Sequence, residues 1–230
     1  MDKAGNKSKR NIYDCIYTNQ PIKVDGLLNE PSWGKAKVLS FIEPVTNKKT
    51  LSPTEARLLW DDKYLYVGFK AYDKDIWSYY KRRDDPTCTE DVLEIFFKTD
   101  PKKEPYYNFE INAINTVYDA FNVKRNSAGS DHRWSKWNCK GLKSAVSIKG
   151  TLNNWEDIDE WWCLEVAIPF SSLPTLDGNI PKIGDRWLFH LARYDYSVYL
   201  PKGVELSSCT RLSKVNFHLH EDWMTLRFVG

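Results

Sequence analysis

Two charged side chains interrupt otherwise apolar runs of the sequence. Glu94 lies within the run from Val92 to Phe96, and Arg193 lies in the run that ends at Tyr194. An ionised group at such a position is costly unless it has a partner or borders a wet cleft. Two interpretations stay open. The two residues form a buried Glu–Arg pair, or both project into one polar pocket and bind hydroxyl groups.

Aromatic residues are numerous, with 10 Trp, 13 Tyr and 10 Phe, and several lie between predicted strands. Trp77 and Trp134 lie in two such segments, and Phe217 adjoins His218 in a third. Sugars present apolar C–H faces together with hydroxyl groups, so they are bound by flat aromatic rings beside planar polar groups. These residues are therefore candidates for a carbohydrate site, although core packing is the commoner role of a single Trp.

Pairs of carboxylates in turn segments suggest a metal. Asp73 with Asp75, and Asp84 with Asp85, offer the hard oxygen ligands that calcium prefers. We expect one structural calcium ion in this region and no required cofactor. The His218–His220 pair either binds a metal or orders the last connection of the chain.

Motifs of the common catalytic sites are missing from the sequence, which has no GxSxG, P-loop, GxGxxG or HExxH pattern. Paired carboxylates can hydrolyse glycosidic bonds, so an enzyme that uses Glu94 with a second carboxylate is the main alternative. The five cysteines are odd in number and widely spaced, which predicts isolated buried thiols. We predict a binding domain rather than an enzyme.

Composition excludes several classes. The 230 residues carry a net charge of +2, which provides no broad basic surface for nucleic acid. No run approaches the roughly 18 apolar residues of a transmembrane helix. A hydrophobic content of 42% is too high for a disordered chain. We expect residues 1–11 to form a disordered leader without a secretory signal and residues 12–230 to form one domain.

The elements that must position these side chains are short strands. Alternating apolar and polar residues predict about ten of them, including Thr54–Trp60, Tyr64–Tyr72, Val92–Lys98 and Tyr106–Asn112. The segment 21–26 also alternates and then breaks at Asp25–Gly26, which is typical of a short strand entering a turn. One short helix from Asn29 to Lys37 and a helical turn at Phe170–Leu173 are expected. The predicted fold is all-β, a mostly antiparallel β-sandwich. Its core is expected to include Trp60, Phe69, Phe96, Ile111, Val166 and Leu191.

The order of several motifs resembles the carbohydrate-binding module family 9-like proteins of the DOMON-type β-sandwich group. The motifs run from about residue 20 to residue 228. They are Ile22–Gly26 with Asn29–Trp33, Leu59–Val67, Glu90–Phe96, Tyr106–Asn112, Gly150–Asn153 with Trp162–Pro169, Gly184–Trp187, and Asn216–His218 with Glu221–Trp223.

The resemblance implies a non-catalytic antiparallel β-sandwich of immunoglobulin-like or DOMON-like type, which binds oligo- or polysaccharides outside the cell, in the periplasm or at the cell surface. It also implies polysaccharide-degrading enzymes as partners. Family members clamp the sugar between two rings. The first ring position falls at Cys88 or Thr89 here, and the second falls near Phe217 or in 207–209.

The polar strand positions of the family match better. Glu94 corresponds to a family carboxylate and Arg193 to a recurrent arginine. Glu110 and Asn112, in the Tyr106–Asn112 motif, complete the polar set. A further alternative comes from group members that hold haem through Met, His or Lys ligands. Met224 is the single methionine beyond residue 1.

Overall fold

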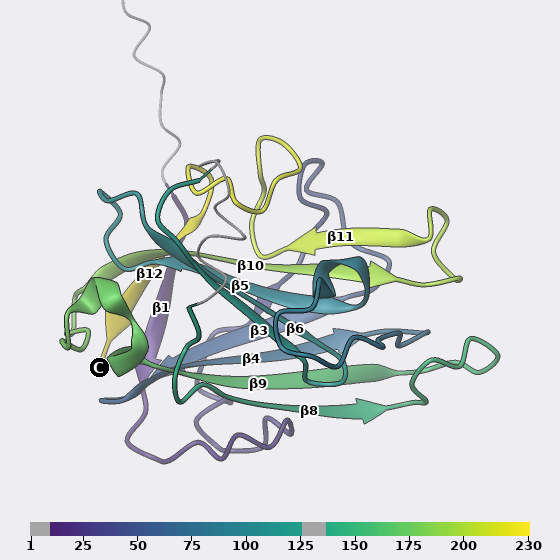
Figure 1. Cartoon of the computed structure of the whole chain (residues 1–230), viewed down its shortest axis with the longest axis horizontal. Helices are drawn as coiled ribbons and strands as arrows, with labels where there is room; N and C mark the ends of the chain where they lie inside the picture. Colours follow the sequence, from purple (N-terminus) through teal and green to yellow (C-terminus); the bar gives the residue numbers. More distant parts are fainter. Residues whose placement is uncertain (1–9, 126–136) are drawn as a thin grey trace, which may run out of the picture.

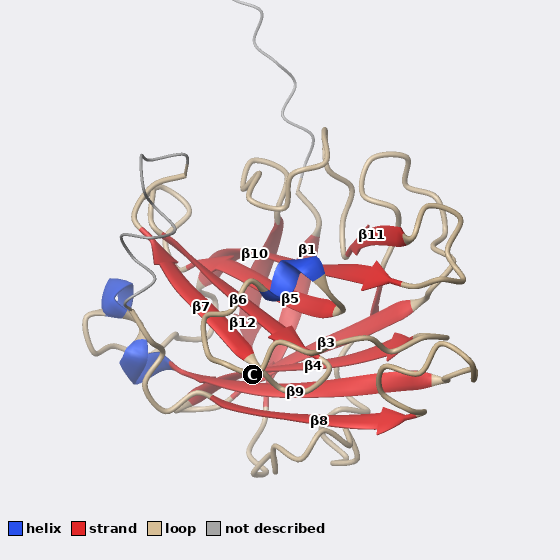
Figure 2. Ribbon diagram, turned by 45° about the vertical axis from the view of Figure 1, so that its right-hand side comes forward, coloured by secondary structure: helices blue, strands red, loops and turns tan. Residues whose placement is uncertain are grey.

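The structure is a computed structural model, which describes residues 10–125 and 137–230. These residues form β-strands and three short 3-10 helices, and they contain no α-helix (Figure 2). The strands are β1 Ile12–Tyr17, β2 Leu39–Ser40, β3 Thr54–Trp60, β4 Tyr64–Tyr72, β5 Val92–Lys98, β6 Tyr106–Asn112, β7 Val117–Asn122, β8 Lys143–Lys149, β9 Trp161–Pro169, β10 Arg186–Tyr196, β11 Val204–Ser208 and β12 Met224–Val229. The helices are η1 Thr87–Thr89, η2 Phe170–Ser172 and η3 Pro174–Leu176.

The strands form one curled sheet whose two halves face each other (Figure 1). The order is β7-β6-β5-β10-β12-β1-β3-β4-β9-β8, with β11 paired to β10 and β2 paired to β3. Neighbours are antiparallel except for β1, which runs parallel to both β12 and β3. The predicted all-β class is confirmed. The sheet is mixed rather than wholly antiparallel, because β1 lies between the two halves and runs parallel to both of its neighbours, β12 and β3.

The main core lies between the two halves of the curled sheet. Leu93, Ile95 and Phe97 of β5 point into it, together with Phe69 of β4 and Leu191 of β10. All six core residues predicted from the sequence are buried. Phe96 differs in its location, because strand alternation turns it to the opposite face, where it packs with Phe217 and Trp223.

Local turn chemistry overrode two predictions. The segment expected as a helix from Asn29 to Lys37 forms successive tight turns, in which Trp33 N–H donates to Glu30 C=O at 3.0 Å. Trp33 still faces inward, because its indole N–H donates to the Glu165 carboxylate. The segment 21–26, predicted as a strand, is a loop. Its Asp25 and Gly26 N–H groups also donate to Glu165 instead of to a neighbouring strand.

Within the described residues, no helix is long and apolar enough to span a membrane. The five cysteines are free thiols, as predicted; four of them are buried, whereas Cys88 is half-buried. Met224 packs into the main core among aromatic and aliphatic side chains.

Candidate functional site

A polar group of residues lies on the side of β5, β6 and β10 that faces away from the main core. We call it the Glu94 face and define it as Glu94, Asn108, Glu110, Tyr194 and Tyr196. Antiparallel pairing places Glu94 directly opposite Glu110 on one side and Ala192 on the other. Asn108 and Glu110 are two positions apart on β6, and Tyr194 and Tyr196 are two positions apart on β10. Strand alternation therefore places both side chains of each pair on the same face of the sheet.

The two carboxylates of the Glu94 face have different surroundings. Glu110 accepts hydrogen bonds from the Asn108 amide at 2.9 Å and the Thr87 hydroxyl at 3.1 Å. Glu94 is 3% exposed, and its Oε2 atom has no hydrogen-bond partner. Burial, and then the neighbouring charge of Glu110, raises the pKa of Glu94 well above its usual range. A ligand hydroxyl can satisfy the unpaired Glu94 oxygen.

Aromatic rings flank these carboxylates. The Tyr194 and Tyr196 rings stack at 6.4 Å, and Phe217 meets Tyr194 edge-on at 5.3 Å. Burial raises the pKa of Tyr194, and the charge of Glu94 raises it further, which places the phenol near that carboxylate. Sequence reasoning missed both tyrosines. The sequence signal that could have found them is alternation along β10. Tyr194 and Tyr196 lie two and four positions after Ala192, so they take the same face of the strand as Ala192, and Arg193 takes the other face.

Arg193 lies on the opposite side of β10, so both interpretations of a shared role with Glu94 are wrong. The guanidinium is fully buried and donates to the Asp73 carboxylate at 2.7 Å. It also donates to Tyr72 C=O at 2.8 Å and to the Thr54 hydroxyl at 3.1 Å. Arg193 therefore links β10 to the facing half of the sheet through the core, where it does not contact the Glu94 face.

Three buried carboxylates surround this guanidinium. Asp73 follows β4, Asp91 precedes β5 and Asp195 lies near the end of β10, and their ligand oxygens lie within 4.8 Å of one another. Two oxygens bound to one calcium ion at roughly 2.3–2.6 Å reach a similar separation. The arrangement can hold a metal ion. Asp73 was a predicted ligand, whereas Asp91 and Asp195 come from strands that sequence reasoning did not associate with it.

The charges in this acidic triad do not balance. When all three carboxylates are ionised, they exceed the single guanidinium by two negative charges, and Arg193 contacts Asp73 and Asp195. Burial raises the pKa of Asp73 to about 6 and raises the pKa of Asp91 well above its usual range. Asp195 is 1% exposed, and neither of its carboxylate oxygens has a hydrogen-bond partner, although Oδ1 forms a 3.3 Å ion pair with Arg193. A divalent cation would neutralise the excess charge and coordinate these oxygens.

The other predicted metal ligands serve the backbone. Asp75 accepts a hydrogen bond from Val198 N–H at 2.9 Å, which ties its loop to the end of β10. Asp85 accepts from Arg82 N–H at 2.9 Å and closes a turn. Asp84 adopts a left-handed conformation with φ of 65°. Asp75, Asp84 and Asp85 are not members of the triad.

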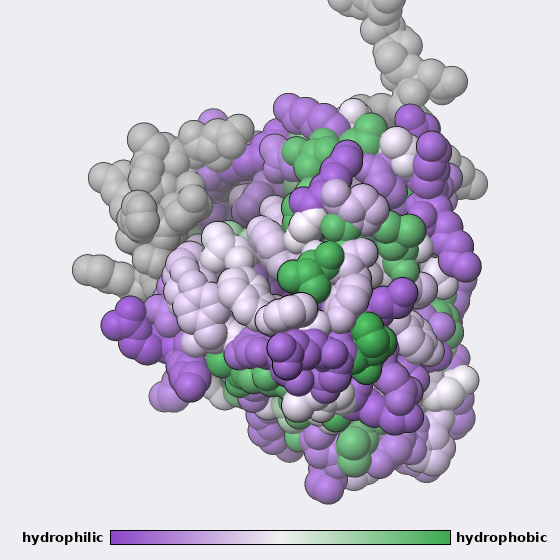
Figure 3. Space-filling model, turned by 90° about the vertical axis from the view of Figure 1, so that its right-hand side faces the viewer, coloured by the Kyte–Doolittle hydropathy of each residue, from purple (hydrophilic) through white to green (hydrophobic). Residues whose placement is uncertain are grey.

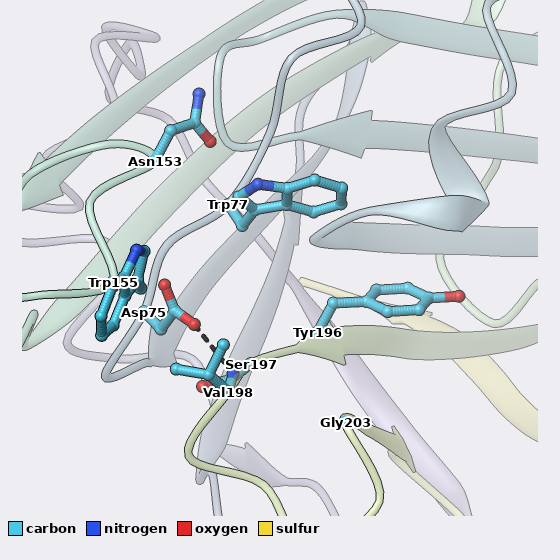
Figure 4. Close-up of a pocket in the computed structure, with 8 residues that line it drawn as sticks. All are labelled: Asp75, Trp77, Asn153, Trp155, Tyr196, Ser197, Val198 and Gly203. Carbon is cyan, nitrogen blue, oxygen red and sulfur yellow. Dashed lines mark hydrogen bonds between the residues drawn. The ribbon is translucent and has the colours of Figure 1, made fainter.

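The remaining predicted sugar contacts are dispersed. The Asn112 amide donates to Tyr80 C=O and to Glu90, so it orders a loop beside the Glu94 face. The ring of His218 shares a 2.8 Å hydrogen bond with the Tyr106 hydroxyl. Trp77 lines a pocket at the end of the molecule (Figure 4). Trp134 lies outside the described residues.

Comparisons with known proteins cover most of the chain. The family described as carbohydrate family 9 binding domain-like matches residues 24–197. An exoglucanase, XynX of Acetivibrio thermocellus, is 27% identical over 157 residues, which are 68% of this chain and 12% of that enzyme. The chain therefore spans a small part of the exoglucanase. An extracellular protein of Arthroderma benhamiae is 26% identical over 203 residues, which are 84% of this chain and 86% of that protein.

Solved structures share the fold. A putative carbohydrate-binding protein from Bacteroides uniformis has a TM-score of 0.70 at 14% identity, covering 96% of this chain and 100% of that one. A family 9 carbohydrate-binding module from Caldicellulosiruptor kristjanssonii in complex with cellotriose has a TM-score of 0.65 at 14% identity, covering 96% and 94%. The same kind of module in complex with glucose has a TM-score of 0.64 at 14% identity, covering 96% of both chains.

Proposed function

The chain belongs to the carbohydrate family 9 binding domain-like family, and on this basis we propose that it binds gluco-oligosaccharides on the Glu94 face. It is a non-catalytic domain, and the hydrolase alternative is not supported. The structurally similar modules with cellotriose and glucose support a glucose-based ligand. The observation that carries the location is the unpaired, buried Oε2 atom of Glu94 beside the stacked Tyr194 and Tyr196 rings.

The chemistry of this face fits a sugar. Tyrosine rings provide flat apolar surfaces for C–H groups, and Tyr194 and Tyr196 are both partly exposed. An ionised carboxylate forms the stronger, charge-assisted hydrogen bonds with hydroxyl donors, and ligand hydroxyl groups that donate to Glu94 favour this charged form. Cys88, where the resemblance places the first family ring, has no ring, and the Tyr196 hydroxyl donates to its backbone C=O at 3.1 Å. Tyr196 then supplies an aromatic ring next to that position.

The test is calorimetric titration of the intact chain with glucose and cellotriose. Glu94→Gln keeps the shape of the side chain and removes its charge. We expect weaker binding by about 1–3 kcal/mol, the range for hydrogen bonds to charged groups. Glu165→Gln is the matched control, because Glu165 is also a buried strand carboxylate, on β9, where it bonds a loop and not the Glu94 face. Equal affinities for wild type and Glu94→Gln would contradict the proposed site.

We also propose that the metal of the acidic triad is calcium and that its role is structural. All three candidate ligands are carboxylates, which are hard oxygen donors, and the triad joins the ends of β4, β5 and β10. The Asp195 Oδ2 atom, which has neither a hydrogen bond nor an ion pair among the described residues, supports a ligand at this position. An ion held there would tie the two halves of the sheet at the end that also carries Trp77.

The relatives support a place of action outside the cell. One is named an extracellular protein, and another is an exoglucanase of which this chain matches a small part. We propose that the domain brings a polysaccharide-degrading activity to its substrate, as part of one chain or as a separate partner. Localisation of the tagged full-length protein by fractionation of culture and cells tests this. Recovery in the cytosol alone would contradict it.

A further inference from the structure

A second aromatic pocket opens at the end of the molecule where β4, β9 and β10 meet their loops. Its volume is about 310 Å³. Three segments line it: the loop after β4 with Asp75 and Trp77, the β8–β9 loop with Asn153 and Trp155, and the end of β10 with Tyr196 and the residues that follow (Figure 4). Seen from this end, pale and hydrophobic residues gather in the middle of the surface and hydrophilic residues surround them (Figure 3).

The walls of the pocket are held by hydrogen bonds between the three segments. The Asn153 side chain accepts from Ser78 N–H and donates to Ser78 C=O, both at 2.8 Å. Asp75 accepts from Val198 N–H at 2.9 Å. The Tyr199 hydroxyl donates to Trp155 C=O at 2.7 Å. The pocket is therefore formed before any ligand arrives, which reduces the entropy cost of binding.

The lining groups match the two kinds of surface on a pyranose ring. The Trp77 side chain is 36% exposed and that of Trp155 is 62% exposed, which is unusual for the largest apolar side chain. Among the described residues, neither indole N–H has a hydrogen-bond partner. The pocket thus combines two indole N–H donors and the Asp75 carboxylate with the aromatic faces of Trp77 and Trp155. A sugar residue supplies C–H groups for the faces and hydroxyl groups for the polar atoms.

Tyr196 connects this pocket to the Glu94 face. Tyr196 is one of the residues that line the pocket, its ring stacks on Tyr194 at 6.4 Å, and its hydroxyl donates to the Cys88 backbone C=O. We propose that the Trp77–Trp155 pocket is a second subsite, which binds a pyranose residue of the same oligosaccharide whose other residues occupy the Glu94 face. This inference rests on the proposed function. It predicts that the domain recognises a stretch of chain rather than one sugar residue.

The test compares glucose with cellohexaose by calorimetric titration. Wild type should bind cellohexaose at least tenfold more tightly than glucose. Trp155→Ala should lower the affinity for cellohexaose about tenfold and change the affinity for glucose less than twofold. The exposed position of Trp155 means that the variant should fold, which the melting temperature checks. Trp155→Phe keeps an aromatic face and should recover part of the loss.

A matched control replaces an exposed apolar side chain elsewhere. Ile183 is 70% exposed and does not line the pocket, so Ile183→Ala should leave both affinities unchanged. The inference is overturned if Trp155→Ala leaves cellohexaose binding intact, or if it weakens glucose and cellohexaose equally. Equal wild-type affinities for the two sugars would overturn it as well. Wild type that binds neither sugar would refute the proposed function itself, and the second subsite with it.

Discussion

Replacing Arg193 with methionine tests the electrostatics of the buried acidic triad. Methionine has a similar length and no charge, so the change removes the guanidinium while it keeps most of the packing. The lost contacts are the 2.7 Å ion pair with Asp73, the 3.3 Å ion pair with Asp195 and the donations to Tyr72 C=O and the Thr54 hydroxyl. The buried Asp73 and Asp195 carboxylates would then lose the cation that contacts them.

The expected loss is large for a single substitution. Removing one partner of a buried ion pair costs about 3–5 kcal/mol, because the remaining charge stays desolvated. The two neutral acceptors that lose a donor add about 1 kcal/mol each. We expect Arg193→Met to lower the free energy of unfolding by about 5–7 kcal/mol in the presence of a chelator, a large share of the roughly 5–15 kcal/mol of a typical domain.

The assay is urea unfolding followed by tryptophan fluorescence, with and without calcium. Calcium at about 100 times its Kd should restore about 2.7 kcal/mol, because a ligand that binds only the folded state stabilises it. Arg227→Met is the matched control. Arg227 bonds Asp14 at 2.6 and 2.8 Å in a partly exposed pair, which solvent screens, so its loss should be far smaller.

Two results would refute this reasoning. A loss below about 1.5 kcal/mol in chelator would show that the triad does not need the guanidinium, since it falls under the range for an uncompensated buried charge. Weaker sugar binding by folded Arg193→Met would show that Arg193 contributes to the ligand site despite its position in the core.

Three further predictions concern other carboxylates. Asp195→Asn should abolish the calcium-dependent rise in melting temperature that we expect for wild type, and coincident wild-type curves in calcium and chelator would remove the structural ion. Glu165→Ala should lower the free energy of unfolding by about 2–4 kcal/mol, because the Glu165 carboxylate accepts four hydrogen bonds. The donors are the backbone N–H groups of Asp25, Gly26 and Leu28 and the indole N–H of Trp33. A negligible change in urea unfolding would contradict this prediction. The raised pKa of Glu94 means that its contribution to stability is fully present below its unfolded pKa, about 4.3, and is lost as the pH rises through the folded pKa. Glu94→Gln should therefore gain stability relative to wild type as the pH rises, and parallel pH–stability curves would count against the shift.

Alternation along the chain was enough to predict most strands and their faces. The bounds of β3, β4, β5 and β6 follow from period-2 patterns, because a half-buried strand must place every second side chain in the core. The same alternation separates Glu94 from Leu93 and Ile95 on β5. Order of motifs along the chain also indicated the family, which the match to residues 24–197 confirms.

Strand pairing was not readable from the sequence. One neighbour of β5 is β6, the next strand along the chain, but the strand on its other side is β10, which begins only at Arg186. That second pairing depends on how the whole sheet forms. Without that register, Arg193 looked like a partner for Glu94, although Ala192 is the residue opposite Glu94. The parallel pairing of β1 with β3 and β12 was hidden for the same reason, since its partners lie at distant positions.

The two candidate ligand sites beyond the Glu94 face depend on tertiary structure alone. Asp73, Asp91 and Asp195 are each unremarkable near a strand end, and they form a triad because three strands end at one place in the curled sheet. Trp77 and Trp155 likewise come from separate loops that meet beside Tyr196. Local patterns determine which residues form strands and which face each residue takes, because those depend on nearest neighbours. The meeting of distant strand ends is decided by how the complete sheet closes around its core.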